Sequence, residues 1–359
     1  MNIKKISKLI CICLILTAVN APASEESSIP NELGAPKAYE TSADYSVQYG
    51  SVKVANELQR VIVTIPNKTG PHPALLLVGG LGCYSLDFSG AVPTVDAYKK
   101  IIEFMTKNGF VTMRVEKTGM GDSKGQACAE QNFDRELAGY VAGLKALKSY
   151  NFVNSDRVSI FGHSIGGVIA PLLIEQVPVH TVIVMGTLAE RWYDYDHTNN
   201  MRQLLLSGMT PEQVTNEMKI HDYVAKEFFI NKKTPAEILK VYPQGKFYLE
   251  FPAHYTYMQQ LADLDLAKNW VKSSAKVFML LGNGDFIGSQ WPEIQKFNSG
   301  INKTREVKIQ AEQVPSLDHF FRNADSMAES FYNISLAGTP LVFQDKFLDV
   351  LASKIPEMK

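Results

Sequence analysis

The sequence predicts an α/β protein with a mostly parallel, doubly wound sheet, helices on both faces and one helical insertion. Strand-like and helix-like runs alternate along the chain, and the strand-like runs are almost wholly apolar, as in strands buried on both faces. The alternation breaks once, over about 188–270, and then resumes. With 359 residues, 45% hydrophobic and 20% charged, the composition is that of an ordinary globular chain of one large domain or two average ones.

The first 23 residues have the three-part form of a secretory signal peptide. A basic "MNIKK" precedes the apolar "LICICLILTAV", and a small-x-small triplet follows at 21–23. The apolar run is too short to span a bilayer comfortably, although an uncleaved anchor is the alternative. Residues 24–44 are polar and predict a loose N-terminal lead-in before a domain at 45–359. We expect an exported protein, periplasmic or secreted, with no stable membrane insertion and a net charge of −4 after removal of residues 1–23.

Seven apolar runs bounded by polar or glycine-rich stretches predict strands. They lie at 60–66, 73–80, 110–117, 157–162, 180–187, 275–285 and 305–312. Helices are predicted at 94–109, where Gly109 marks the C-terminal stop, and at 132–150, where apolar residues recur on one face. A further helix is expected to begin at Ile165.

The stretch at about 188–270 is helix-like and rich in aromatic residues. An insertion near the carboxyl ends of parallel strands would cover a site as a lid. The alternative is a helical insertion with a purely structural role. Its aromatic residues could line an acyl or aryl pocket or simply pack the helices together. They are Trp192, Tyr193, Tyr195, Tyr223, Phe228, Phe229, Tyr255 and Tyr257.

A G-x-S-x-G motif at 162–166 lies between a predicted strand and a predicted helix. A very tight strand-to-helix turn lifts a serine out of the chain path, and bulky neighbours would clash there, so glycines at Gly162 and Gly166 are required. The following helix would direct its N–H groups towards whatever Ser164 attacks. An ordinary βα turn is the alternative, since the motif alone is common.

A serine nucleophile needs a base, and the base needs an orienting acid. In a sheet of this kind the order is serine, acid, histidine, each on a loop after a later strand. Asp285 stands at the carboxyl end of the strand at 275–285, and His319 follows the last predicted strand. Asp318 and Asp265 are alternatives for the acid.

The tetrahedral intermediate of acyl transfer needs two N–H donors. Ile165, the residue after the nucleophile, supplies the first by its position. The second is expected from the glycine loop at 79–82, where Leu81 is the first choice and Gly82 the second. A merely flexible turn is the alternative for this loop.

In these features the chain resembles the α/β-hydrolases from about Val47 to the C-terminus. Within that superfamily it resembles exported bacterial serine esterases and the serine aminopeptidase branch, whose loop after the fourth strand is similar to "RVEKTGMGDSKG" at 114–125. Many relatives begin the oxyanion loop with His-Gly, whereas this chain has Gly79-Gly80. This departure leaves the second N–H donor open. A serine nucleophile excludes dehalogenase chemistry, which uses aspartate in this family.

The resemblance also predicts a disulfide between Cys83 and Cys128. In this fold the strands that precede the two cysteines are neighbours, and both loops leave at the edge that holds the serine. Export into an oxidising compartment would leave these two cysteines in the mature chain. The alternative is two free thiols.

The sequence thus predicts a serine hydrolase that cleaves carboxylic esters. Its partner would be a small-molecule ester or a short peptide, with no nucleic acid, because the chain has near-neutral charge and no dense basic block. No cofactor and no metal is expected, since HExxH, paired CxxC and P-loop motifs are lacking. One alternative is an aminopeptidase-like serine peptidase whose insertion holds a substrate ammonium with Glu190, Asp194 or Asp196. A non-catalytic binding protein on this fold is another, which a complete triad disfavours.

Overall fold

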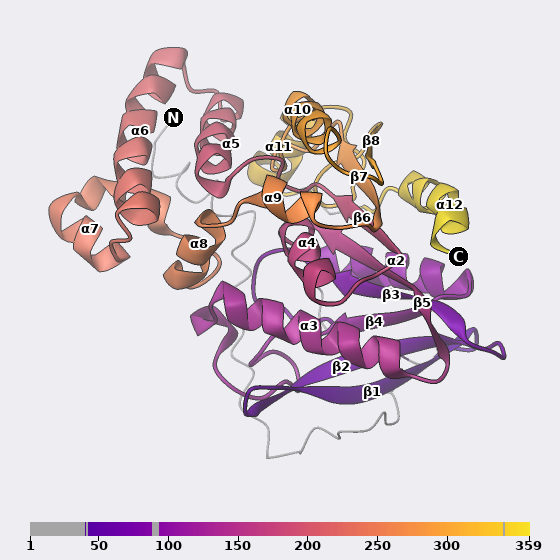
Figure 1. Cartoon of the computed structure of the whole chain (residues 1–359). Coiled ribbons are helices and arrows are strands. Elements are labelled where there is room, and N and C mark those ends of the chain that lie inside the picture. The colour runs from indigo at the N-terminus through magenta and orange to yellow at the C-terminus, as the bar shows by residue number, and fades with distance from the viewer. Residues whose placement is uncertain (1–39, 41, 88–92, 340–341) are drawn as a thin grey trace.

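The computed structural model describes residues 40, 42–87, 93–339 and 342–359, and an eight-stranded sheet forms its centre (Figure 1). The strand order is β1-β2-β4-β3-β5-β6-β7-β8. The first two strands are antiparallel to their neighbours, and from β4 to β8 all pairs are parallel. The strands are β1 (Tyr45–Val54), β2 (Glu57–Pro66), β3 (His72–Val78), β4 (Val111–Val115), β5 (Val153–His163), β6 (Thr181–Met185), β7 (Lys276–Gly282) and β8 (Ile309–Val314).

Helices cover both faces of the sheet because successive apolar side chains of each buried strand point to opposite faces. Leu76 packs into one core cluster with α3 and α4, whereas Leu75 and Leu77 pack into the other with α2 and α12. This is the doubly wound arrangement that the sequence predicts. The flanking helices are α2 (Pro93–Lys107), α3 (Phe133–Ser149), α4 (Gly166–Gln176), α10 (Trp291–Ile301), α11 (Met327–Phe331) and α12 (Lys346–Met358), with short turns η2 (Cys128–Glu130) and η5 (Tyr332–Leu336).

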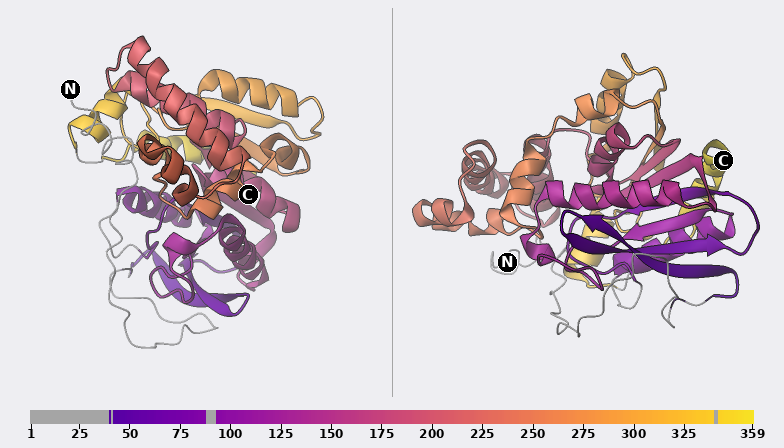
Figure 2. Two further views of the ribbon diagram at one scale, coloured as in Figure 1. Left: turned by 90° about the vertical axis from the view of Figure 1, so that its left-hand side faces the viewer. Right: turned by 60° about the horizontal axis from the view of Figure 1, so that its bottom comes forward.

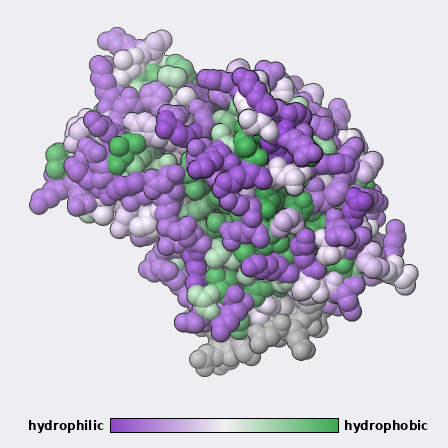
Figure 3. All heavy atoms as spheres, viewed as in Figure 1, coloured by the Kyte–Doolittle hydropathy of each residue, from purple (hydrophilic) through white to green (hydrophobic). Residues whose placement is uncertain are grey.

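The stretch between β6 and β7 is helical, as predicted, and projects beyond one end of the sheet (Figures 1 and 2). Thr210 and Thr234 begin two of its helices, each with a reciprocal capping bond to Gln213 or Glu237 and a proline at the first helical position. Hydrophilic residues cover most of its visible surface (Figure 3). The helical insertion consists of α5 (Trp192–Leu206), α6 (Pro211–Ala225), η3 (Lys226–Ile230), α7 (Pro235–Val241), η4 (Pro243–Leu249), α8 (Tyr255–Ala262) and α9 (Leu266–Val271).

The seven predicted strands are all present, with ends that differ by a few residues. The sequence analysis missed the ten-residue edge strand β1, whose polar and apolar residues alternate. The signal peptide at 1–23 and almost all of the lead-in at 24–44 lie outside the described residues. Within the part of the chain that the structure describes, no helix combines the length and apolarity needed to cross a bilayer.

Cys83 and Cys128 form the predicted disulfide, with their Cα atoms 5.8 Å apart. Their loops follow β3 and β4, which are parallel neighbours in the sheet. The bond joins positions 45 residues apart, for which the chain-entropy model gives about 4 kcal/mol of stabilisation. The glycine loop at 79–82 is therefore tied covalently to the loop after β4.

Candidate active site

Ser164 occupies the sharp turn between β5 and α4, with a left-handed φ of 56°. Such a backbone is costly for a residue with a side chain and persists only where surrounding contacts enforce it. A Cβ atom on Gly162 would lie 2.7 Å from the carbonyl oxygen of Gly166, and one on Gly166 would collide with the carbonyl oxygen of Val78. Both glycines of the motif are thus needed for this turn, as the sequence analysis expected.

His319 and Asp285 meet in a buried hydrogen bond, in which His319 Nδ1 lies 2.9 Å from Asp285 Oδ2. The other carboxylate oxygen accepts the backbone N–H groups of Ile287 and Gly288, each at 2.8 Å. Burial alone would raise the pKa of Asp285, but the charge and hydrogen bond of His319 and these two N–H groups outweigh it. The pKa of this carboxyl is held below its ordinary value, so Asp285 stays ionised beside the imidazole.

The two alternative acids are engaged elsewhere. Asp318 is buried and binds Arg322 Nε at 2.7 Å, and it also accepts the hydroxyl of Ser330. Asp265 accepts the backbone N–H of Lys268 at the start of α9. Of the three carboxylates, Asp285 is the one in contact with the His319 ring.

His163 connects the serine turn to the loop that carries His319. Its Nε2 lies 2.8 Å from the carbonyl oxygen of His319, and its ring centroid lies 4.9 Å from that of His319. Its Nδ1 lies 2.6 Å from the hydroxyl of Tyr98, which accepts the Gly80 N–H at 2.8 Å. Ser164, which follows His163, lies beside Gly80, because a Cβ on that glycine would be 3.7 Å from Ser164 Cβ. The turn, the glycine loop and the loop of His319 therefore come together around the buried ring of His163.

The glycine loop is anchored by several hydrogen bonds, one of which occupies the N–H group of Gly80. The N–H group of Gly80 donates to the hydroxyl of Tyr98. The next N–H group along the loop is that of Leu81. Gly82 has a left-handed φ of 120°, which favours glycine. Lys117, from the loop after β4, donates to the carbonyl oxygens of Gly80 at 3.2 Å and Gly82 at 2.9 Å. Both Leu81 and Gly82 lie in this anchored segment.

Lys117 contacts the glycine loop, and the sequence analysis did not single it out. Its side chain is 4% exposed and forms an ion pair with the equally buried Glu136 at 3.1 Å. It also lies over the ring of Tyr84, whose hydroxyl donates to the Gly80 carbonyl oxygen. Lys117 stands inside the segment at 114–125 that carries part of the family resemblance, but its partners come from distant positions.

A cavity of about 150 Å³ lies between the glycine loop and the helical insertion. Trp192 and Tyr195 line it, whereas the other six aromatic residues singled out from the sequence do not, so most of them serve packing. Three further aromatic side chains, Phe247, Tyr248 and Phe251, come from segments that the sequence analysis did not single out. The complete lining is Leu81, Trp192, Tyr195, Asp196, Asn199, Asn200, Gln203, Phe247, Tyr248, Glu250, Phe251, Pro252, Met258 and Ile287.

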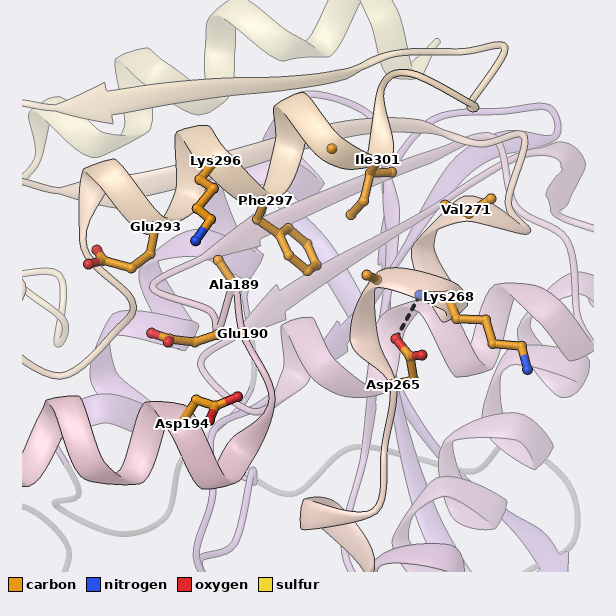
Figure 4. A pocket seen from close by; sticks show the side chains of 12 residues that line it. Ala189, Glu190, Asp194, Asp265, Lys268, Val271, Glu293, Lys296, Phe297 and Ile301 are labelled. Carbon is orange, nitrogen blue, oxygen red and sulfur yellow. Dashed lines mark hydrogen bonds between the residues drawn. The ribbon is translucent and has the colours of Figure 1, made fainter.

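The three acids proposed to hold an ammonium do not share a site. Asp196 lines the cavity beside Leu81, whereas Glu190 and Asp194 line a separate cavity of about 630 Å³ against α10. Figure 4 shows them there with Glu293 along one side of that cavity. Burial, followed by the charges of Glu293 and Asp194, raises the pKa of Glu190. The structure thus leaves Asp196 as the one candidate of the three next to the glycine loop.

The fold and this constellation define an α/β-hydrolase. The model of the family described as serine aminopeptidase, S33, matches residues 86–311, which is more than half of the chain. The chain belongs to this family and is a serine hydrolase. The match includes Ser164 and Asp285, while His319 and the glycine loop at 79–82 lie outside the matched residues.

Solved structures with this fold include several esterases at low sequence identity. An esterase from Pyrococcus furiosus, Pf2001, is 12% identical with a TM-score of 0.54, and the alignment covers 91% of this chain and 98% of that one. Acetyl xylan esterase 1 from Thermoanaerobacterium sp. JW/SL YS485 is 14% identical, with a TM-score of 0.51 and coverages of 88% and 89%. Est1E from Butyrivibrio proteoclasticus, solved with bound ferulic acid, is 13% identical, with a TM-score of 0.50 and coverages of 85% and 99%. No curated protein sequence matches the chain.

The buried His163 predicts a pH dependence of stability. Burial, and secondly the charge of His319, lowers the pKa of His163 from 6.5 to about 3. Between these two values the unfolded chain binds a proton that the folded protein does not, so the free energy of unfolding decreases as pH falls below about 6.5. Urea unfolding at pH 7 and pH 5 is expected to show a smaller loss for His163→Gln than for the wild type. Equal losses in the two proteins would show that His163 does not contribute.

Proposed function

We propose that the protein is an exported carboxylesterase in which Ser164 attacks the ester carbonyl carbon. His319 accepts the serine proton as the new C–O bond forms, and then donates it to the leaving alcohol as the ester bond breaks. Water, deprotonated by His319, attacks the acyl-enzyme and releases the carboxylic acid and the serine. Asp285 fixes the tautomer in which His319 Nδ1 carries the hydrogen, and it stabilises the charged imidazolium.

The N–H groups of Ile165 and Leu81 are the proposed donors to the oxyanion of the tetrahedral intermediate. Ile165 immediately precedes α4, so its N–H lies at the positive end of the helix dipole. Leu81 is favoured because the preceding N–H, that of Gly80, is taken by Tyr98. Gly82 remains the alternative donor.

One observation carries the proposal. The strained, half-buried Ser164 directly follows His163, whose ring contacts the backbone of His319, and His319 in turn is hydrogen-bonded to Asp285. A purely structural turn would not need the strained backbone at Ser164 or an ionised acid against a histidine. The esterase names of the solved structures with this fold agree with an ester substrate.

The N-terminal sequence and the disulfide support export. The three-part pattern at 1–23 is that of a signal peptide, and a disulfide such as Cys83–Cys128 persists in oxidising compartments. We propose that the mature protein acts in the periplasm or outside the cell.

Substitution of the triad residues tests the mechanism. Ser164→Ala is expected to lower turnover by about 10⁶-fold and to abolish labelling by a fluorophosphonate probe. Asp285→Asn should cost about 10⁴-fold, because an amide at this position stabilises the wrong imidazole tautomer. Asp265→Asn is the matched control, since asparagine caps a helix as well as aspartate. Normal labelling of Ser164→Ala, or full activity of Asp285→Asn, would refute these assignments.

Lys117 is expected to position the oxyanion loop. Lys117→Met should lower kcat about 10- to 100-fold with little change in KM, since misplaced oxyanion donors weaken binding of the transition state. It should also destabilise the fold by about 3 kcal/mol, because Glu136 is left as a buried unpaired charge. The double variant Lys117→Met/Glu136→Gln should regain stability but not kcat. Wild-type kcat in the double variant would show that Lys117 has only a structural role.

Cleavage of short peptides is a second candidate function. Asp196 lines the cavity beside Leu81, where a carboxylate could hold a substrate ammonium. However, His221 Nε2 already lies 2.8 Å from its Oδ2 atom, which weakens this role.

A substrate panel separates the two activities. We expect p-nitrophenyl esters to be hydrolysed faster than aminoacyl anilides, with rates that decline as the acyl chain outgrows the cavity of about 150 Å³. The comparison uses kcat/KM for both series, with Ser164→Ala as the blank. Faster cleavage of the anilides would favour the peptidase.

A further inference from the structure

Two histidines and an aspartate converge between α5 and α6 of the helical insertion. His197 Nδ1 lies 2.7 Å from Asp222 Oδ1, and His221 Nδ1 lies 3.0 Å from the same oxygen. One ligating atom from each of the three residues lies within 4.8 Å of the other two. Figures 1 and 2 show the two helices side by side, away from the sheet. The three residues of this cluster belong to α5 and α6, whereas Ser164, His319 and Asp285 lie on segments that follow strands of the sheet.

The distances suit a small divalent cation after a minor side-chain adjustment. In a tetrahedral site with ligand bonds of about 2.0–2.2 Å, ligand atoms lie about 3.3–3.6 Å apart. The two separations from Asp222, 2.7 and 3.0 Å, would widen by about 0.3–0.9 Å, and the two histidine nitrogens, which lie within 4.8 Å of each other, would adjust to the same spacing. A cation between the three atoms would replace the N–H hydrogens that now face the carboxylate of Asp222.

A second carboxylate orients the buried histidine. The side chain of His221 is 1% exposed, and its Nε2 lies 2.8 Å from Asp196 Oδ2. Metal-binding histidines commonly donate their other ring N–H to a carboxylate, which fixes the tautomer and ring orientation. The ring of Tyr248 packs edge-on against His221 at a centroid distance of 5.2 Å. His221 is thus held with Nδ1 directed at the cluster.

The other two side chains provide access from solvent. His197 is 40% exposed and Asp222 is 50% exposed, so a cation can reach the cluster without opening the core. Two imidazoles with one carboxylate favour Zn²⁺ and similar transition metals over Mg²⁺ and Ca²⁺, which prefer oxygen ligands. Three protein ligands would leave one position for water.

We infer that His197, His221 and Asp222 form a binding site for a divalent transition-metal cation, with Zn²⁺ as the best fit. The bound cation links α5 to α6, because His197 belongs to α5 and the other two ligands belong to α6. Through His221 the site also contacts Asp196, which lines the cavity beside the glycine loop. The cation would hold this wall of the cavity in place without taking part in the reaction.

Thermal unfolding with and without metal tests the site. Full-length protein without an affinity tag is treated with a chelator, dialysed and titrated with Zn²⁺ or Mg²⁺. At free Zn²⁺ about 100-fold above Kd, we expect the Tm to rise by about 5 °C, and Mg²⁺ should give no shift. Equilibrium dialysis should give one Zn²⁺ per chain. Ser164→Ala should bind Zn²⁺ in the same way, so this result does not depend on the proposed esterase activity.

Single substitutions of exposed ligands locate the binding. His197→Ala and Asp222→Ala should abolish both the Tm shift and stoichiometric binding, with near-ultraviolet circular dichroism confirming that each variant is folded. His180→Ala, which removes a histidine outside the insertion, should keep both. Absence of saturable Zn²⁺ binding in the wild type would overturn the inference, as would folded His197→Ala and Asp222→Ala variants that bind like the wild type.

Discussion

The left-handed backbone of Ser164 is the constraint on which the site depends. It exists because β5 must turn at once into α4, and this turn brings Gly166 against the carbonyl oxygen of Val78 at the end of β3. A side chain on Gly162 or Gly166 would push the strand and helix apart. The same turn places His163 inward, against the loop of His319. One strained residue therefore determines how three segments approach each other.

Buried hydrogen bonds fix the positions of these segments relative to one another. Gly80 contacts Tyr98, Tyr98 contacts His163, and His163 contacts the backbone of His319. Each partner is largely removed from water, so a missing member would leave an unsatisfied polar group at a cost of about 1–3 kcal/mol. Lys117, from the loop after the neighbouring strand β4, adds a charged contact to the glycine loop. The geometry of the site thus depends on residues that have no proposed part in the reaction itself.

Local patterns in the sequence were enough to predict most of the fold, the strained turn at Ser164 and the residues that form the pair of His319 and Asp285. The elbow at Ser164, and the strand ends before Asp285 and His319, are encoded within a few residues of each position. The roles of Tyr98 and Lys117 were not predictable, because their partners lie far away in the chain and only the folded packing selects them. The division of the insertion's acids between two cavities depends likewise on how its helices pack. The edge strand β1 was missed because its alternating pattern is less apolar than that of the buried strands.

The disulfide closes a covalent ring that ends at Cys128, before β5 begins. Both cysteines precede the serine turn, the acid and the histidine in sequence. In a chain that emerges N-terminus first into an oxidising compartment, the ring can close while the remainder is still being delivered. The glycine loop is then already tethered to the loop after β4 when the segment with Ser164 arrives. The order in which the segments leave the export channel would thus favour assembly of the proposed active site from its N-terminal part, in addition to the final geometry.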